Sequence, residues 1–565
     1  MWQSLLVLLL FFTSPLFAAE RATVTILATT DLHGNIMPYD YFTGKPANRG
    51  LAKIATLINR VRAENPNTLV IDCGDTIQGT PLEYVYQTFV RTSKPPLGLE
   101  APPGLSADPM MRVMNHLKFD AMVLGNHEFN FGLKNLDRAR ADARFPWLSA
   151  NTQGGKEFLR YTIKRSGRIR VAIVGVTTPG VPTWEKPENY AGYRFIPMAE
   201  AVKDTLSELQ HQEQDVVVVA AHSGLDRDLK TGERFRALPG ENDIYGIAQV
   251  PGVDAIIFGH THRELPHASI NGVLLNQPRN WGMSLGRVDL TLEKVEHGWK
   301  VVEKTSTTIP VTDDVPADPE IVEIARPYHE LAERYLGAVI AEARESVDSS
   351  AGRVRDSALV DAIHEVQMHY AQADVSFAAL FNPRVRVPKG PVTVRQIAAL
   401  YLYENELYAV EGTGQLVKDV LEYSSGYYLQ CPDAVCSQGP LINRKIIGYN
   451  YEMAQGVDYE IDLTQPPGSR IRNLRFKGEP LAMDRKLRIA VNNYRAGGSG
   501  GYSMFRGAKI VWRSNEDIRQ LIIDYFTAKK TLPAKPDGNW RVVPESAQRL
   551  LDAEANREAS RSLTQ

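Results

Sequence analysis

The sequence predicts an α/β fold: sheets flanked by helices in a first domain, and a second α/β domain joined to it by a linker helix. The chain has 565 residues, which is more than one hydrophobic core usually supports. Short apolar runs alternate with helical patterns up to about residue 290, and a mixed pattern resumes after residue 346. We therefore expect a first domain over 22–304, a connecting region over 305–345 and a second domain over 346–544.

In the first domain, apolar runs and capping residues define the expected elements. Helices are expected over 50–64 and over 108–117, where Asp108 is a suitable N-cap and Pro109 occupies the first turn. Strands are expected where β-branched or apolar runs end abruptly in polar residues, over 23–31, 67–75, 120–128, 170–178, 215–224 and 254–262. Such runs are typical of strands buried on both faces of a largely parallel or mixed sheet.

The connecting region begins with TSTTIPVTDDVPADPE, residues 305–320, whose Thr, Asp and Pro content predicts a linker. Residues 321–345 are then predicted to form one helix into the second domain. There we expect helices such as 358–372 and strands such as 459–464 and 486–494. The polar segment 545–565 is expected to be a frayed helix or disordered tail.

The N-terminus has the outline of a cleavable export signal over residues 1–19. An apolar run from Leu5 to Phe12 is followed by a Ser-Pro break and by small residues at Ala18 and Ala19, although no Lys or Arg precedes it. The alternative, a transmembrane anchor, needs about 20 apolar residues. We therefore expect a periplasmic or secreted protein with no membrane span after cleavage.

Three cysteines are too few for a disulfide framework. Cys431 and Cys436, in CPDAVC, can close a small loop in an oxidising compartment, and whether they are bridged is left open. Cys73 lies in the apolar run LVIDCGD and is expected to be a buried thiol.

The charge balance excludes one class of partner. The chain carries 64 Lys+Arg against 66 Asp+Glu, a net charge of -2, whereas a polynucleotide-binding surface needs a strongly basic balance. A small anionic substrate remains compatible, because a few local cations hold it. We expect no polynucleotide partner and a monomeric chain.

Metal-ligand residue types follow five of the predicted strands, in the motifs DLHGN, GDT, GNHE, AHSG and GHTH. These motifs contain Asp31, His33, Asp75, Asn126, His127, His222, His260 and His262. Residues beyond the carboxyl ends of strands converge on one crevice in an open α/β sheet. Carboxylate, imidazole and carboxamide groups suit borderline or hard divalent ions, and the lack of Cys argues against a structural zinc site.

The alternative explanation is that each of these residues is a helix cap or a satisfied polar group. Five of the 12 histidines fall in these motifs, and each motif also contains a Gly, so coincidence explains the pattern poorly. No role is assigned to the other seven, which are His116, His211, His267, His297, His329, His364 and His369.

The ordered series of motifs resembles the calcineurin-like metallophosphoesterases. The two-domain layout narrows the resemblance to the bacterial 5'-nucleotidase and 2',3'-cyclic-nucleotide 2'-phosphodiesterase family, over nearly all of the mature chain. The resemblance implies a metallophosphoesterase sandwich, a C-terminal nucleotide-binding domain, small-molecule nucleotide substrates, and two divalent metal ions per chain, of the type Mn, Zn, Co or Mg.

The resemblance also implies roles for individual residues. The first metal would be held by Asp31, His33, Asp75 and His262. The second would be held by Asp75, Asn126, His222 and His260, so that Asp75 bridges the two. His127 would face the phosphate and stabilise the transition state or protonate the leaving sugar oxygen; the alternative is that it only orients metal ligands.

For the base, the matching positions are Tyr403, with Asn405 beside it, and Tyr494, which would stack on either face of any base. The alternative is that both tyrosines are ordinary core or surface aromatics. Arg384 and Arg386 lie near the family's phosphate-binding arginine, although the glycine-rich loop of that pattern is missing here.

Two departures bear on the substrate. The 5'-nucleotidases pair the His127 equivalent with an Asp, whereas this chain has Asn130, which cannot act as a charge partner. Their GGDG loop is GGSGG here, around Ser499. Both departures resemble the cyclic phosphodiesterases. We therefore expect hydrolysis of 2',3'-cyclic nucleotides with 3'-nucleotidase activity; the alternatives are a broad-range 5'-nucleotidase and a catalytically silent nucleotide-binding protein.

Overall fold

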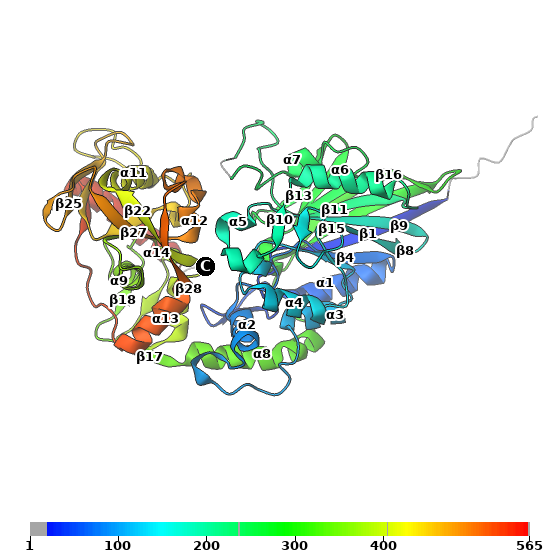
Figure 1. Cartoon of the computed structure of the whole chain (residues 1–565), viewed down its shortest axis with the longest axis horizontal. Coiled ribbons are helices and arrows are strands. Elements are labelled where there is room, and N and C mark those ends of the chain that lie inside the picture. Colours follow the sequence, from blue (N-terminus) through cyan, green and yellow to red (C-terminus); the bar gives the residue numbers. More distant parts are fainter. Residues whose placement is uncertain (1–19, 236–237, 404, 563–565) are drawn as a thin grey trace, which may run out of the picture.

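The computed structural model describes residues 20–235, 238–403 and 405–562, which form two lobes (Figure 1). The expected signal segment over 1–19 lies outside the described residues. Within the described ranges, no helix combines the length and apolar character needed to cross a bilayer.

The first domain contains two six-stranded mixed sheets, which confirms the predicted fold class. The first sheet has the order β16 (Trp299–Pro310), β15 (Ser284–Lys294), β1 (Arg21–Thr29), β4 (Thr68–Asp72), β5 (Ala121–Val123) and β6 (Trp147–Leu148). The second has the order β13 (Leu265–Ile270), β14 (Val273–Gln277), β12 (Ala255–Phe258), β11 (Val216–His222), β9 (Ile169–Thr177) and β8 (Tyr161–Ser166).

The two sheets pack face to face. Ile26 and Val123 of the first sheet belong to the same fully buried cluster as Ile173, Val218 and Ile257 of the second. In the first sheet β1, β4, β5 and β6 are parallel, and in the second β9, β11, β12 and β14 are parallel, while the remaining strands pair antiparallel. The carboxyl ends of β1, β4 and β5 therefore lie at one edge of the sandwich, as do those of β9, β11 and β12.

Helices cover the outer faces of the sandwich. Those of the first domain are α1 (Leu51–Glu64), α2 (Pro81–Thr92), α3 (Pro109–His116), α4 (Leu133–Asp142), α5 (Val181–Trp184), α6 (Met198–Leu209) and α7 (Ile244–Ile247). The predicted cap of α3 is confirmed, since the Met111 backbone N–H donates to the Asp108 carboxylate at 3.0 Å. Pro109 begins the helix, as the sequence predicts.

The connecting region differs from the prediction at both ends. Residues 305–310, expected as linker, form the second half of β16, where alternate Thr residues suit an exposed edge strand. The connecting helix α8 (Pro319–Gly337) ends earlier than predicted. Residues 339–343 form β17 (Val339–Ala343) instead, paired with β21 (Gly390–Thr393). Gly337 and the following β-branched Val339 favour this change from helix to strand.

The second domain is built on a five-stranded sheet in the order β23 (Glu452–Gln455), β19 (Val375–Ala379), β27 (Lys486–Asn492), β22 (Glu406–Thr413) and β28 (Ile510–Asp517). A four-stranded sheet has the order β26 (Glu479–Pro480), β25 (Ile471–Phe476), β24 (Asp458–Asp462) and β29 (Trp540–Val543). The helices are α9 (Ala358–Ala371), α10 (Val394–Leu400), α11 (Gly414–Ser424), α12 (Asn493–Ala496), α13 (Ile518–Lys529) and α14 (Glu545–Ser562).

The expected polar tail is a packed helix over most of its length. In α14, Ala547 and Leu551 are fully buried. The buried Glu554 carboxylate accepts from the Leu441 and Ile442 backbone N–H groups at 2.6 and 3.3 Å. The helix therefore caps the second domain, and the prediction of fraying or disorder was wrong for residues 545–557.

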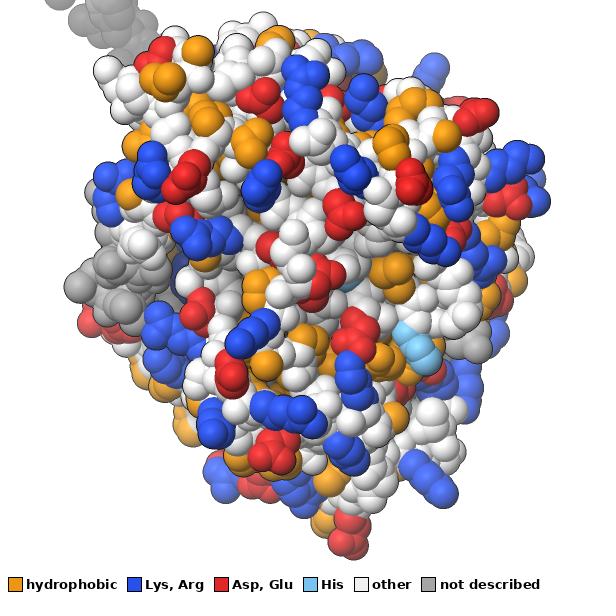
Figure 2. All heavy atoms as spheres, turned by 90° about the vertical axis from the view of Figure 1, so that its left-hand side faces the viewer, with side chains coloured by type: hydrophobic (Ala, Val, Ile, Leu, Met, Phe, Trp, Pro, Cys, Tyr) orange, Lys and Arg blue, Asp and Glu red, His pale blue; other side chains and the backbone are white. Residues whose placement is uncertain are grey.

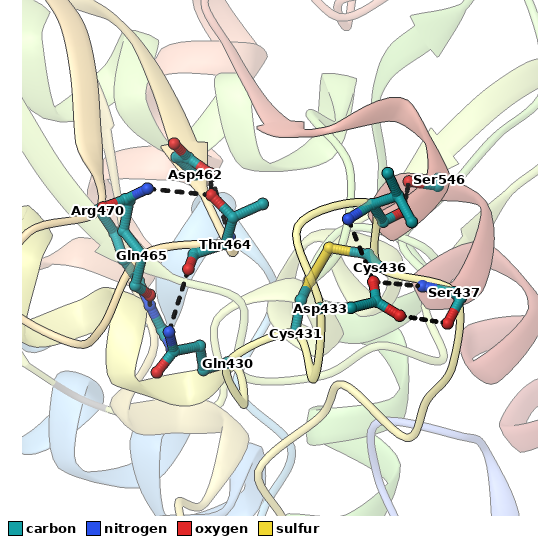
Figure 3. The surroundings of a disulfide bond; sticks show 11 residues. Gln430, Cys431, Asp433, Cys436, Ser437, Asp462, Thr464, Gln465, Arg470 and Ser546 are labelled. Atoms are coloured by element: carbon teal, nitrogen blue, oxygen red, sulfur yellow. Dashed lines mark hydrogen bonds between the residues drawn. A yellow bond between two sulfur atoms is a disulfide. The ribbon is translucent and has the colours of Figure 1, made fainter.

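Cys431 and Cys436 form a disulfide, which settles the pairing that the sequence leaves open (Figure 3). Inside the loop that it closes, the Asp433 carboxylate accepts from the Val435 and Ser437 backbone N–H groups, each at 3.1 Å. Cys73 is a free, buried thiol, as predicted.

Candidate metal centre and substrate contacts

The strand ends bring the seven predicted metal ligands together. Asp31, Asp75 and Asn126 follow β1, β4 and β5, while His222 is the last residue of β11 and His260 follows β12. Two groups of ligand atoms result: Asp31 with His33 and His262, and Asp75 with His222 and His260. Five of these residues are buried, namely Asp31, His33, Asp75, Asn126 and His222.

In the first group, the donor atoms face one another. His33 Nε2 lies 3.0 Å from His262 Nε2, which in turn lies 3.4 Å from Asp31 Oδ1. His33 donates its Nδ1 proton to the Gln78 carbonyl at 2.9 Å, so its Nε2 presents a lone pair. Bonds of about 2.1 Å to one ion place ligand atoms about 3.0 to 3.4 Å apart, so these three residues fit a divalent cation.

The second group has the same arrangement around Asp75. His222 donates its Nδ1 proton to the Cys73 carbonyl at 2.7 Å, which leaves Nε2 facing inward. This Nε2 lies 3.0 Å from Asp75 Oδ2 and 3.1 Å from Asn126 Oδ1. His33 Nε2, of the first group, lies 3.9 Å from the same Asp75 oxygen. Asp75 therefore stands between the two groups, where a bridging ligand belongs.

The backbone is strained at these positions. Of the fifteen non-glycine residues with positive φ in the described part of the chain, five are predicted ligands: Asp31, His33, Asp75, His260 and His262. Such conformations cost about 1 to 3 kcal/mol each and persist where the surrounding structure enforces them, most often at functional sites.

Two glycines leave room for the ligand loops. A Cβ on Gly125 would lie 2.3 Å from Asp75 Oδ1. A Cβ on Gly259 would lie 1.7 Å from Thr30 Oγ1 and 2.6 Å from Asp31 Oδ2. The Gly of GNHE and the Gly of GHTH are therefore required by the close approach of the carboxylates.

Electrostatics keep both aspartates charged. Burial raises the pKa of Asp75, but the imidazoles of His222, His127 and His33 outweigh burial and hold it well below its usual value. Burial likewise opposes ionisation of Asp31, yet His262 lowers its pKa to about 2. Burial lowers the pKa of His33 to about 4, whereas at His222 the charge of Asp75 outweighs burial and raises the pKa to about 10.

Two carboxylates that the sequence analysis did not single out support the ligands. Glu128, the last residue of GNHE, is buried and accepts from the backbone N–H groups of Asp75, Thr76 and Gly125 at 2.9, 2.6 and 2.7 Å. Glu241 accepts from His260 Nε2 at 3.2 Å, which leaves Nδ1 of that ring for a metal. The GNHE motif contained the signal for Glu128; no motif surrounds Glu241.

His127 lies beside the ligand groups without joining either. Its Nε2 is 4.0 Å from Asp75 Oδ2, and its side chain is 35% exposed, so the ring is accessible from solvent. On the other side of the ring, Nδ1 donates to Asn130 Oδ1 at 2.6 Å. The Asn130 amide donates to the buried carboxylate of Glu185, a contact that the sequence did not indicate.

The two predicted base-stacking residues have exposed rings in the second domain. Tyr403 is 43% exposed and packs against Phe381, and Tyr494 is 38% exposed with the Arg495 guanidinium over its ring. Burial of its hydroxyl raises the pKa of Tyr494 to about 12; Arg495 opposes this shift, whereas Glu241, Tyr449 and Tyr403 add to it. The Tyr494 hydroxyl therefore lies near the Tyr403 hydroxyl and near the Glu241 carboxylate of the first domain.

The remaining predicted contacts lie less directly at this site. Asn405 donates to the Tyr401 hydroxyl at 3.4 Å. Arg384 and Arg386 are exposed, and Arg386 belongs to the short strand β20 (Arg386–Val387). Burial raises the pKa of Tyr403. The guanidinium groups that oppose this shift are those of Arg353 and Arg495, and not those of Arg384 or Arg386.

Comparisons with known proteins agree with this geometry. The family model described as calcineurin-like phosphoesterase matches residues 24–264, and that described as 5'-nucleotidase, C-terminal domain, matches residues 338–507. The trifunctional nucleotide phosphoesterase protein YfkN of Bacillus subtilis is 32% identical over 95% of this chain, which spans 40% of that protein.

A 2',3'-cyclic-nucleotide 2'-phosphodiesterase/3'-nucleotidase of Salmonella typhimurium is 30% identical, over 94% of this chain and 91% of its own length. Among solved structures, one from Staphylococcus aureus assigned to the 5'-nucleotidases superposes with a TM-score of 0.78 at 25% identity, covering 92% of this chain and all of its own.

Proposed function

Since the chain belongs to the calcineurin-like phosphoesterases that carry a 5'-nucleotidase C-terminal domain, we propose that it hydrolyses 2',3'-cyclic nucleotides and then removes the 3'-phosphate. Membership of this family makes it a phosphoric ester hydrolase. The observation that carries the proposal is the placement of two ligand groups on either side of Asp75, with His127 Nε2 open beside them.

Two divalent ions fit the donor set described above. The first would be held by Asp31, His33, Asp75 and His262, and the second by Asp75, Asn126, His222 and His260. When bound, such a pair supplies Lewis acidity that activates water and neutralises charge on the phosphoryl oxygens. The residues themselves orient the site, since His33 and His222 are held by backbone carbonyls with Nε2 facing inward.

His127 acts on the phosphate and not on a metal. Its Nδ1 proton is committed to Asn130, so only Nε2 is free for the substrate. A protonated Nε2 donates to a phosphoryl oxygen, or passes its proton to the sugar oxygen that leaves. Because Asn130 is neutral, His127 is oriented by an amide and not by a charge partner.

The second domain supplies the nucleotide contacts. Exposed Tyr403 and Tyr494 offer flat aromatic faces, each worth about 1 to 3 kcal/mol to a stacked base of any type. On the outer face of this domain, Lys and Arg side chains are interspersed with Asp and Glu, with no continuous basic stripe (Figure 2). This face therefore lacks the basic stripe that a polynucleotide-binding surface needs.

The proposed location is outside the cytoplasm. The apolar segment at residues 1–19 and the Cys431–Cys436 disulfide both support export to an oxidising compartment. The second candidate activity is that of a broad-range 5'-nucleotidase, favoured by the C-terminal domain model and by the Staphylococcus aureus structure.

A substrate panel tests the proposal. Purified protein is compared on 2',3'-cyclic AMP, 3'-AMP and 5'-AMP, and we expect the first two to be hydrolysed with the higher kcat/KM. The activity should disappear with a chelator and return with a divalent metal, because the described site offers no Ser or Cys nucleophile. A clear preference for 5'-AMP would establish the second candidate, and full turnover of metal-free protein would overturn the mechanism.

A further inference from the structure

Glu185 is a buried carboxylate between α5 and the 3-10 helix at Pro187–Tyr190, outside all five metal motifs. It is 7% exposed and accepts from two amides. The Asn130 side chain donates to its Oε1, and the Asn189 side chain donates to its Oε2 at 2.8 Å. Burial raises the pKa of Glu185 to about 8, and the Asn189 and Asn130 amides oppose this shift by donating to its two oxygens.

The contact with Glu185 determines which end of the Asn130 amide meets His127. In its ionised form, with both oxygens accepting as they do here, Glu185 selects the NH2 end of the amide and turns Oδ1 toward the ring. Oδ1 in turn accepts from His127 Nδ1 at 2.6 Å. Without Glu185, the amide is free to present its NH2 group to the ring, and Nδ1 would have to give up its proton to accept.

The segment that carries Glu185 is also attached to the second domain. The adjacent Lys186 ammonium lies 2.8 Å from Glu406 Oε1, and the Asn493 side chain donates to the Trp184 carbonyl at 2.6 Å. On the first-domain side, the Trp184 ring lies 5.6 Å from that of His260. Glu185 is therefore held from both domains, which restricts its position relative to Asn130.

We propose that Glu185 is a positioning residue for the phosphoesterase reaction: through Asn130 it keeps the Nδ1 proton on His127 and leaves Nε2 for the phosphate. This inference rests on the proposed role of His127 at the reacting phosphate. Glu185 itself does not touch the substrate or a metal ligand. Its loss changes the orientation and proton position of His127 and leaves both ligand groups in place.

The first test removes the carboxylate. Glu185→Ala should lower kcat at least tenfold on both 2',3'-cyclic AMP and bis(p-nitrophenyl) phosphate, with little change in KM and with the metal content of the native protein. Glu188→Ala is the matched control, because it removes an exposed carboxylate from the same segment, and it should leave kcat unchanged.

The second test exchanges the carboxylate of Glu185 with the amide of Asn130. It remains decisive if Glu185→Ala folds poorly. Glu185→Gln and Asn130→Asp alone should each lower kcat, because the first places an NH2 group against Asn189 or Asn130, which both donate there, and the second pairs two carboxylates. The double variant Asn130→Asp with Glu185→Gln restores one carboxylate and one amide, with an acceptor on His127 Nδ1, and should recover kcat to within about threefold of native.

Each outcome decides the inference. It is overturned if Glu185→Ala keeps native kcat, or if the double variant loses as much as the product of the two single losses. Loss of metal from Glu185→Ala would also overturn it, since Glu185 would then support the ligands instead of His127. The proposed nucleotide specificity fails separately, if native protein cleaves the aryl diester but not 2',3'-cyclic AMP.

Discussion

Asp75 differs from the other proposed ligands because both ligand groups meet at its carboxylate. His222 Nε2 lies 3.0 Å and His33 Nε2 3.9 Å from the same oxygen, Oδ2. Its position is fixed from behind by Glu128, which accepts from the Asp75 backbone N–H at 2.9 Å. In the proposed two-metal site, a residue placed in this way would serve both cations and screen them from each other.

Replacing Asp75 by Ala should therefore remove both metal ions, whereas His262→Ala should weaken only one. We expect elemental analysis to find almost no metal in Asp75→Ala and about half of the native content in His262→Ala, with a larger loss of kcat/KM for the former. If Asp75→Ala retained native metal content, Asp75 would not be the bridge.

Among single residues, those within motifs could be predicted from the sequence, whereas supporting residues outside the motifs could not. Six of the proposed ligands come together in two groups, and Asn126 Oδ1 lies 3.1 Å from His222 Nε2, because each lies at or just beyond the end of a strand that the apolar pattern identifies. Glu241 and Glu185 belong to segments with no motif, and their roles depend on which atoms the fold brings to His260 and Asn130. One sequence does not contain that information in any local pattern.

Among elements, strong periodicity predicted α1 and α3 correctly, while weaker signals failed at domain edges. Residues 305–310 contain turn-forming and strand-forming types together, and pairing with β15 decides in favour of a strand. The C-terminal segment has a polar composition, so its burial against the second domain was not predicted. In both cases a tertiary contact overrides local propensity.

The packing of α14 makes a prediction about stability. Leu551 is fully buried, so Leu551→Ala should lower the free energy of unfolding by about 2 to 5 kcal/mol, through lost burial and the cavity that remains. Urea denaturation of the full chain measures this change. Arg549→Ala, on the exposed face of the same helix, is the control and should cost about 0.5 kcal/mol or less. Equal stability of the two variants would contradict the packed helix.

At the scale of the whole molecule, metal ligands and aromatic contacts come from different domains. The family models divide at the same place, since one ends at residue 264 and the other begins at residue 338. Helix α8 connects the two lobes (Figure 1). The second domain would supply binding energy for the base, and the first domain would supply the chemistry at the phosphate. A substitution in one domain should leave the contribution of the other unchanged.

Changing both Tyr403 and Tyr494 to Ala tests this division of labour. Each ring contributes about 1 to 3 kcal/mol of stacking to a nucleotide and little to a small aryl ester, so nucleotide kcat/KM should fall at least tenfold. Hydrolysis of bis(p-nitrophenyl) phosphate by the same variant should change little. His127→Ala provides the contrast, because a group that acts at the phosphate should lower the rate for every substrate.

Comparison of these two variants separates base binding from chemistry. In the double Tyr variant, we expect a loss of kcat/KM that depends on the substrate. In His127→Ala, we expect a similar loss of activity on every substrate. If the double Tyr variant stayed folded and lost both activities equally, its tyrosines would not form a base clamp. The nucleotide substrate would then rest on similarity to relatives alone, because the metal groups around Asp75 are equally suited to other phosphate esters.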